Sequence, residues 1–116
     1  MRVFYEAYGT GEPTILFFPT WEIVHSRAWK LQIPYLALHC RGITFDRRGN
    51  GRSDRPREVR AYDRRVTADD ALAVLDKVGA RRVTLVSWCG CGDDLILAVE
   101  HPEWSRAWFS SRPTSC

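Results

Sequence analysis

Three short apolar runs alternate with helical segments along the chain, and this alternation constrains the fold more than any other feature. The runs are TILFFP (residues 14–19), GITFD (residues 42–46) and RRVTLVS (residues 81–87), each typical of a strand buried on both faces. An earlier segment, RVFYEAY, alternates as a strand does and ends at the turn GTGEP. Strands and helices in this order predict right-handed βαβ units and a mostly parallel sheet. We therefore expect an α/β fold class with helices flanking the sheet.

Helical periodicity separates the apolar runs. Residues 26–39 form the first helical segment, which Pro34 is expected to kink, and its apolar face comprises Trp29, Ile33, Leu36 and Ala37. A second helix is expected to begin at Thr67 as its N-cap, with Asp70 three residues further on, and to end at Gly79. Its apolar face comprises Ala68, Ala71, Leu72, Leu75 and Val78.

Composition argues against several functional classes. The chain has 116 residues, of which 45% are hydrophobic and 27% charged, as in an ordinary globular protein. The formal charge is +3, but the arginines between positions 47 and 65 alternate with acids and turn residues, so we expect no nucleic-acid partner. No apolar run approaches the ~20 residues that span a bilayer, and the amino-terminal sequence lacks an apolar signal region. We therefore expect no membrane partner and a cytoplasmic location, with reduced cysteines at Cys40, Cys89, Cys91 and Cys116.

The segment SWCGCGDDL (residues 87–95) sets small residues around a cysteine, directly after the third apolar run and directly before a helical one. A nucleophile elbow needs this pattern, because strand and helix backbones approach closely on either side of a strained nucleophile. With Cys89 as the nucleophile, Ser87 and Cys91 occupy the small positions. With Cys91 as the nucleophile, Asp93 would occupy one of them and fit less well, so Cys89 is the predicted nucleophile.

Two other interpretations of Cys89 stay open. It is an inert small residue in a degenerate elbow, or it binds a metal together with Cys91. A C-x-C pair without a second pair nearby is a poor metal signature, so no metal and no cofactor are expected.

Over residues 5–106 the chain resembles the α/β-hydrolase fold superfamily, in its broad hydrolase and acyltransferase branch. The resemblance rests on ILFFPTW, AWKLQIPYLA, TFDRRGNGRSDRP, ADDALAVLDKVG, VTLVSWCGCG and AVEHPE, in the family's order and at its spacing. DRRGNGRSDRP is the most specific of these, because it is similar to the family's loop after strand four, and SWCGC takes the place of the usual G-x-S-x-G. The resemblance implies a partial α/β-hydrolase fold in which residues 14–19 lie between residues 42–46 and residues 81–87.

The resemblance also implies an oxyanion hole beside Cys89. The family's oxyanion loop corresponds here to Pro19 and Thr20. The backbone N–H groups of Trp21 (or Thr20, if the loop is one residue off) and Gly90 would then hold the developing oxyanion. We expect Cys89 near the amino terminus of the following helix, with its sulfur facing Thr20 and Trp21.

The remaining polar residues are interpreted as structural. The family's general base is a histidine late in the chain, and this chain has only His25, His39 and His101, which we interpret as surface or capping residues. Asp93 and Asp94 are interpreted as charges at the positive end of the last helix. The loop after residue 45 is expected to be pinned by Asp46, Arg48 and Ser53.

After EHPEWSRA the resemblance ends, and WFSSRPTSC follows where the family has another parallel strand. Codons for residues 106–113 can be chosen so that a frame shifted by one base encodes GLVLIAP, a sequence typical of that strand. We therefore expect residues 1–106 to be an amino-terminal α/β-hydrolase segment, truncated before the sixth strand, and residues 107–116 to be a frameshifted tail. This tail is expected to leave the edge of residues 81–87 unpaired and open to self-association.

The functional expectation is hydrolase-like chemistry on an ester, thioester or related acyl bond of a small molecule of unknown identity, through Cys89. Lacking the acid and histidine of a triad, the chain alone is expected to turn over little or no substrate. One alternative is a non-catalytic binding or interaction fragment with the same fold. A second is a complete small thiol enzyme that uses His25 as its base.

Overall fold

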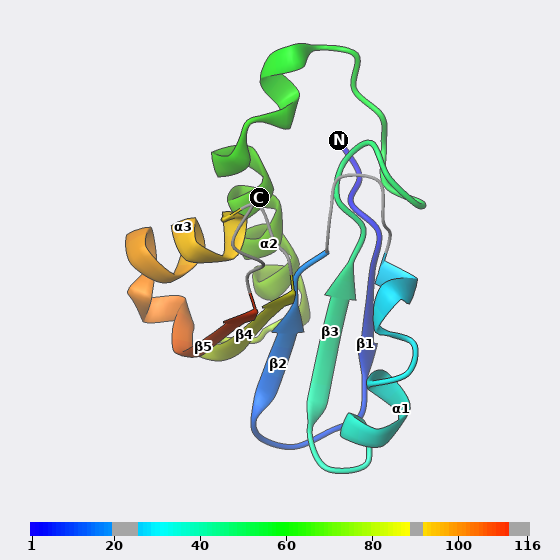
Figure 1. Cartoon of the computed structure of the whole chain (residues 1–116), viewed down its shortest axis with the longest axis vertical. Helices are drawn as coiled ribbons and strands as arrows, with labels where there is room; N and C mark the ends of the chain where they lie inside the picture. Colours follow the sequence, from blue (N-terminus) through cyan, green and yellow to red (C-terminus); the bar gives the residue numbers. More distant parts are fainter. Residues whose placement is uncertain (20–25, 89–91, 112–116) are drawn as a thin grey trace.

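The structure, a computed structural model, describes residues 1–19, 26–88 and 92–111. Within these residues a five-stranded sheet has the order β1-β3-β2-β4-β5 (Figure 1). The strands are β1 (Tyr5–Tyr8), β2 (Thr14–Phe17), β3 (Arg41–Phe45), β4 (Val83–Trp88) and β5 (Ser105–Ser111). Only the β1–β3 pair is antiparallel within this sheet. The predicted, mostly parallel α/β sheet is confirmed, and so is the predicted position of β2 between β3 and β4.

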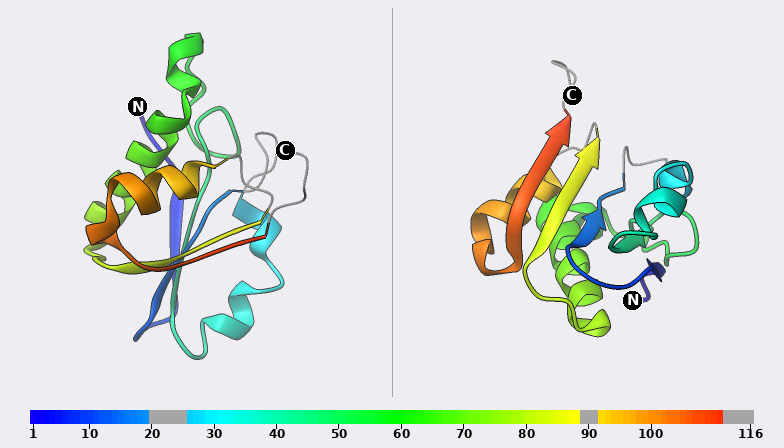
Figure 2. Two further views of the ribbon diagram at one scale, coloured as in Figure 1. Left: turned by 60° about the vertical axis from the view of Figure 1, so that its left-hand side comes forward. Right: turned by 90° about the horizontal axis from the view of Figure 1, so that it is seen from below.

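Helices pack on both faces of the sheet (Figures 1 and 2). Helices α2 (Arg64–Val78) and α3 (Asp93–Glu100) cover one face, and the larger apolar core lies beneath them, with Leu16, Ile43, Leu75, Leu85 and Leu97 fully buried. On the other face, η1 (Ser26–Trp29) and α1 (Ile33–Leu36) enclose a smaller core of Phe17, Trp29 and Ile33. Two further 3-10 turns are η2 (Val59–Tyr62) and η3 (Pro102–Trp104). None of the helices in the described ranges has the length and apolar character needed to cross a bilayer.

The first helical segment differs in form from the prediction. Residues 26–39 contain two short pieces, η1 and α1, rather than one kinked helix. Pro34 lies in the first turn of α1, where its missing N–H costs nothing, so it starts a helix here and does not bend one. The predicted apolar face is nevertheless used, because Trp29 and Ile33 are buried and Leu36 packs beside them.

Helix α2 begins earlier than predicted and ends where predicted. Its N-cap is Asp63, whose carboxylate accepts a hydrogen bond from the backbone N–H of Arg65 at 2.9 Å. Thr67 is therefore a buried residue inside the helix and not its cap. The C-cap is Gly79, whose φ of 71° is the left-handed conformation that glycine adopts without strain.

The expected unpaired edge of β4 is wrong. Strand β5 pairs in parallel with β4 from Ser105 to Ser111, over part of the segment that we interpreted as a tail. Such a ladder requires only backbone N–H and C=O groups, and residues 105–111 contain no proline, so the lack of polar–apolar alternation does not prevent pairing. Consequently β4 has a strand on both sides, and β5 is the strand at this edge of the described sheet.

Candidate active site

The carboxyl ends of the parallel strands meet at one edge of the sheet, where open α/β sheets bind their ligands. Strands β2, β3 and β4 end there at Phe17, Phe45 and Trp88. The oxyanion loop, the loop after residue 45 and the segment that contains Cys89 follow these three strand ends. The structure therefore brings the starts of the three segments together at one edge of the sheet (Figure 1). This edge is the candidate active site.

The connection from β4 to α3 is short. Four residues, 89–92, join Trp88 at the end of the strand to Asp93 at the start of the helix. Gly92 caps the helix with a φ of 94°, a conformation that other residues rarely adopt. Ser87 is buried on the α3 side of β4, whereas the side chain of Trp88 is exposed. A strand that is followed after only four residues by a helix is the structural context that a nucleophile elbow requires.

The predicted site residues themselves lie outside the described residues. Thr20 and Trp21 fall in residues 20–25, and Cys89 and Gly90 fall in residues 89–91. The expected orientation of the Cys89 sulfur toward Thr20 and Trp21 therefore stays a prediction. The strand and the helix on either side of Cys89 are where the elbow requires them.

Asp93 and Asp94 stand in the first turn of α3, as predicted, but they are not solvated surface charges. Both are buried, with exposures of 1% and 2%. Asp93 forms an ion pair with Arg47, whose side chain is 7% exposed. Asp94 accepts hydrogen bonds from the hydroxyl of Ser87 at 2.5 Å and from the indole N–H of Trp108 at 2.6 Å. The two carboxylates thus join the start of α3 to the loop after β3, to β4 and to β5.

Sequence reasoning missed Arg47 and Trp108 as partners of these carboxylates. Arg47 stands beside Arg48 in the motif DRRG, and only the second arginine was given a role. Arg47 follows Asp46 directly after a buried strand, and this position is a signal for a buried ion pair. A buried guanidinium needs a charged partner, because burial removes the water that would solvate it. Trp108 lay in a segment for which no strand was expected.

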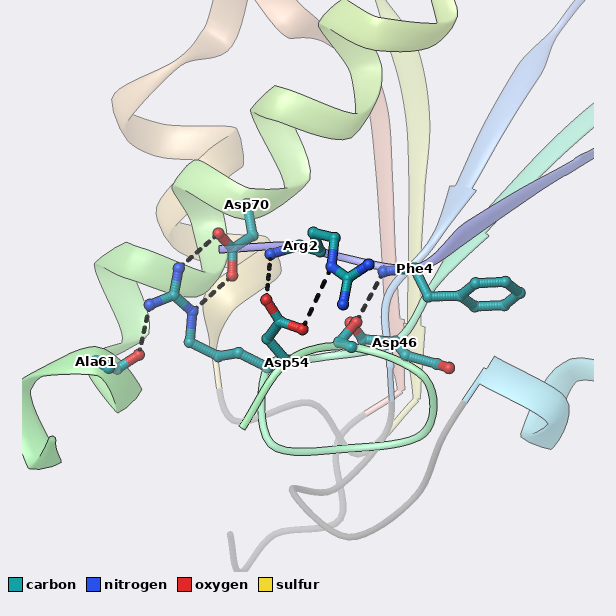
Figure 3. Close-up of polar contacts among 8 residues, drawn as sticks. Arg2, Phe4, Asp46, Asp54, Ala61 and Asp70 are labelled. Atoms are coloured by element: carbon teal, nitrogen blue, oxygen red, sulfur yellow. Dashed lines mark hydrogen bonds and ion pairs between the residues drawn. The ribbon is translucent and has the colours of Figure 1, made fainter. Parts of the chain in front are cut away.

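The loop after β3 is held by its own polar groups, which confirms the structural roles of Asp46, Arg48 and Ser53 (Figure 3). The two carboxylate oxygens of Asp46 accept the backbone N–H groups of Ser26 and Arg52, at 2.8 and 3.0 Å. The hydroxyl of Ser53 donates to the Asp46 carbonyl at 2.6 Å and accepts from the backbone N–H of Phe4 at 2.9 Å. These bonds tie β1 and η1 to the end of β3.

Arg48 links the same loop to α2. Its guanidinium donates two hydrogen bonds to Asp70, at 2.8 and 2.7 Å, and one to the carbonyl of Ala61 at 3.0 Å (Figure 3). The hydrogen bonds to Asp70 raise the pKa of Arg48 above its ordinary value. Asp70 therefore belongs to this ion pair and not to a capping box with Thr67.

The two described histidines lie away from the candidate site. His39 precedes β3 and His101 precedes η3 and β5, so both are at the amino-terminal edge of the parallel strands. His39 packs its ring against Tyr35, and His101 lies 3.6 Å from a carboxylate oxygen of Glu103. His25 is in residues 20–25 and outside the described residues. Neither described histidine is placed to act as a base at the β4–α3 connection.

Two shallow cavities lie along β1 and η1, with volumes of about 160 and 280 Å³. Both are lined by Glu6, Ser26 and Arg27. The hydroxyl of Tyr8 donates to Glu6, and burial together with this hydrogen bond raises the pKa of Tyr8 to about 12. This hydrogen bond joins two side chains of the same strand, β1, which indicates a structural role. Across residues 1–19, 26–88 and 92–111, no group of three or more metal-ligating side chains was found.

Comparison with known proteins shows to which family the chain belongs. The family described as alpha/beta hydrolase fold matches residues 13–91, which include β2, β3, α2 and β4. The chain belongs to the α/β-hydrolase fold family. The resemblance to the α/β-hydrolase fold superfamily inferred from the sequence motifs is therefore confirmed.

Relatives among characterised α/β-hydrolases differ in their named activities. The chain is 41% identical over 88 residues to epoxide hydrolase A of Mycobacterium tuberculosis, covering 70% of this chain and 25% of the relative. It is 33% identical over 96 residues to a non-heme chloroperoxidase of Kitasatospora aureofaciens, covering 82% of this chain and 34% of the relative. The chain thus spans between a quarter and about a third of the length of these two α/β-hydrolases.

A solved α/β-hydrolase structure has the same arrangement of elements. The structure of an N-acyl homoserine lactone degrading enzyme superposes with a TM-score of 0.84 at 29% identity. The match covers 93% of this chain and 40% of the other. The sheet and helices of this chain therefore correspond to about two fifths of that longer enzyme.

Proposed function

We propose that this chain carries the nucleophile of a hydrolase or acyltransferase that acts on an ester, thioester or related acyl bond, and that Cys89 is this nucleophile. The single observation that carries the proposal is the four-residue connection between Trp88 at the end of β4 and Asp93 at the start of α3. Cys89 is the first residue of this connection, and a nucleophile elbow needs such a short connection between a strand and a helix.

The chemistry follows from the residue type. The Cys89 thiolate attacks the acyl carbon, the alkoxide or thiolate of the substrate departs, and a thioester remains on the protein. Hydrolysis of that thioester by water, or its transfer to another nucleophile, regenerates the thiol. The positive end of the α3 dipole favours the thiolate. In this proposal the backbone N–H groups of Gly90 and of Trp21 (or Thr20) stabilise the oxyanion.

The thiol of Cys89 indicates the substrate class, whereas the relatives do not. Their names refer to an epoxide hydrolase, a chloroperoxidase and a lactone degrading enzyme. Similarity to these relatives therefore does not indicate a single substrate class. A cysteine nucleophile favours acyl carbon, because thioesters form and break readily. We propose a small acyl compound as the substrate.

The position of the described histidines favours a second candidate, a non-catalytic binding or interaction fragment. His39 and His101 lie at the amino-terminal edge of the parallel strands, whereas Cys89 follows the carboxyl end of β4. A general base typically raises the rate of such a reaction ~10²–10⁴-fold. We therefore expect acylation of Cys89 to be observable while multiple turnover stays slow.

The test is acylation by an activated thioester, followed by intact mass spectrometry, in three proteins: the parent, Cys91→Ala and Cys89→Ala. We expect one acyl adduct in the parent and in Cys91→Ala, and none in Cys89→Ala. Cys40 serves as an internal control, because it is buried with 4% exposure and should stay unmodified. Equal, slow modification of several cysteines would instead favour the binding fragment.

A further inference from the structure

The net charge of the chain is concentrated in one segment after β3. Residues 52–65 contain six arginines and three acids, a net charge of +3, and the whole chain also has a formal charge of +3. The rest of the chain is therefore balanced, with eleven basic and eleven acidic side chains. Within this segment, η2 stands beyond the carboxyl ends of the strands and away from the sheet (Figures 1 and 2). The excess positive charge of the molecule thus lies outside the packed body.

Two of the three acids in this segment are used inside the protein. Asp54 accepts the backbone N–H of Arg2 at 2.8 Å and forms an ion pair with the guanidinium of the same residue at 3.7 Å. Asp63 caps α2 by accepting the backbone N–H of Arg65. The alternation of arginines with acids in the sequence therefore does not mean that these acids neutralise the arginines beside them.

The arginines divide into a group that is bound to the protein and a pair that projects from it. Four of the six lie against other parts of the protein: Arg52, Arg55, Arg64 and Arg65. Arg57 and Arg60 are solvent-exposed, and within residues 1–19, 26–88 and 92–111 their guanidinium groups form no hydrogen bond or ion pair. These two charges are therefore available to a partner.

Contacts with the rest of the protein fix the segment that carries this pair. The hydroxyl of Tyr62 donates to the carbonyl of Pro56 at 2.7 Å, and its ring lies against Gly49, where a Cβ would come within 2.7 Å of it. The guanidinium of Arg48 donates to the carbonyl of Ala61 at 3.0 Å. A segment held in this way loses little backbone freedom when it binds a partner.

Val59 lies between Arg57 and Arg60 in the chain and is 88% exposed. No other large apolar side chain among the described residues is exposed to this extent. An aliphatic side chain with a guanidinium on either side matches an acidic segment that has an apolar residue among its carboxylates. Burial of the apolar groups and attraction between opposite charges would both favour that contact.

The same features argue against two other negatively charged partners. Single-stranded nucleic acids are bound by cations together with aromatic rings on which the bases stack, but the ring of Tyr62 packs against Gly49. A membrane surface is bound by a helix with a broad apolar face. The four residues of η2 offer one exposed aliphatic side chain, Val59.

We infer that residues 55–62, here called the basic arm, bind an acidic segment of another protein that carries an apolar residue among its carboxylates. This inference does not depend on the role of Cys89. An arm of eight residues covers less than the ~800 Å² per partner that is usual in a stable interface. The complex is therefore weak and short-lived, and salt weakens it because the charges are exposed.

The experiment measures fluorescence anisotropy of a labelled probe, a short peptide of glutamates and aspartates with one central leucine. Arg57→Glu with Arg60→Glu is expected to lower the affinity for this peptide at least about tenfold, and Arg57→Gln with Arg60→Gln about threefold. Val59→Ser is expected to lower it about threefold, because the leucine loses its apolar contact. Raising the salt concentration from about 50 to about 300 mM is expected to lower it about tenfold.

The matched control is Arg81→Glu with Arg82→Glu, which makes the same change of charge at two exposed arginines between α2 and β4. These residues lie at the amino-terminal edge of the parallel strands, so we expect the affinity to stay within about twofold of the parent. Circular dichroism shows whether each variant folds, and the glutamine variant decides the question if the glutamate variant at positions 57 and 60 does not fold. Equal losses in the two glutamate variants, or an affinity that neither salt nor Val59→Ser changes, would overturn the inference. Tighter binding of single-stranded DNA or of phosphatidylserine vesicles than of the peptide would also overturn it.

Discussion

Asp94 accepts hydrogen bonds from Ser87 and Trp108, and neither donor carries a charge. Each donor comes from a different strand, so one carboxylate connects β4, β5 and α3. A buried carboxylate needs such donors, because burial removes the water that would otherwise solvate it. The hydroxyl of Ser87, at a position where the family's elbow has a glycine, therefore has a structural use beyond its small size.

We expect Ser87→Ala to lower the free energy of unfolding by about 1.5–3 kcal/mol, the usual range for a hydrogen bond to a charged group. Urea unfolding measures the change. Ser105→Ala is the control, because the hydroxyl of Ser105 makes one long contact, at 3.4 Å, with the carbonyl of Ala107. It should change stability by less than about 0.5 kcal/mol. Equal effects in the two variants would show that the bond to Asp94 contributes little.

Helix ends and loop glycines show how the elements are joined. The end of α2 at Gly79 was predictable, since a left-handed residue after a helix is a local requirement. Its start was predicted wrongly, because Thr67 has the residue type of an N-cap but is buried inside the helix, whereas Asp63 caps it. Gly51, in the loop after β3, meets a different requirement, because its backbone passes close to the carboxylate of Asp46.

Gly79→Ala and Gly51→Ala separate these two requirements. At Gly79 a Cβ would meet nothing within 4 Å, so we expect only the backbone cost of about 1–2 kcal/mol. At Gly51 a Cβ would lie 2.1 Å from a carboxylate oxygen of Asp46, and φ is also positive. We therefore expect Gly51→Ala to destabilise the protein more than Gly79→Ala in thermal and urea unfolding. The reverse ranking would contradict the close approach of the loop to Asp46.

The whole molecule is as compact as an ordinary domain of its length, although the relatives are longer. The Cα radius of gyration is 13.1 Å, and about 13 Å is typical of a compact domain of this length. Strand β5 has a single neighbour in the described sheet, β4, and its other backbone edge is open. Phe109 lies beside Val86 in the register, opposite to the face covered by α2 and α3, and is 63% exposed.

We expect this edge to pair with a second copy of the chain, because an open strand beside an exposed aromatic side chain is a template for association. Size-exclusion chromatography over a range of concentrations should show a concentration-dependent dimer. Phe109→Lys, which places a charge on the strand, should shift the protein toward monomer. Leu38→Lys replaces a side chain that is 78% exposed but lies outside the sheet, and it should leave the association unchanged. A monomer at all concentrations would contradict the prediction.

The burial of the strands followed directly from local patterns, whereas their order followed from the resemblance to the family. Leu16, Ile43 and Leu85 are fully buried, as the continuous apolar runs around them indicated. Parallel strands joined by helices place the loops after them at one edge of the sheet, and the resemblance to the family implied the place of β2 between β3 and β4. The motif around Cys89 was readable for the same reason, since small residues at set spacings are a local property of the chain.

Pairings between distant segments were not readable in this way. Arg47 and Asp93 are far apart in the sequence, and Ser87, Asp94 and Trp108 lie on three different elements. Nothing in the local sequence pattern of these residues indicates their partners. Strand β5 formed although its side chains do not alternate, because its ladder depends on backbone groups and on the free edge that β4 offered. Periodicity reports whether a residue is buried, whereas the choice of its charged or hydrogen-bonded partner depends on how loops bring remote segments together. The ion pair between Arg47 and Asp93 is therefore a product of tertiary packing.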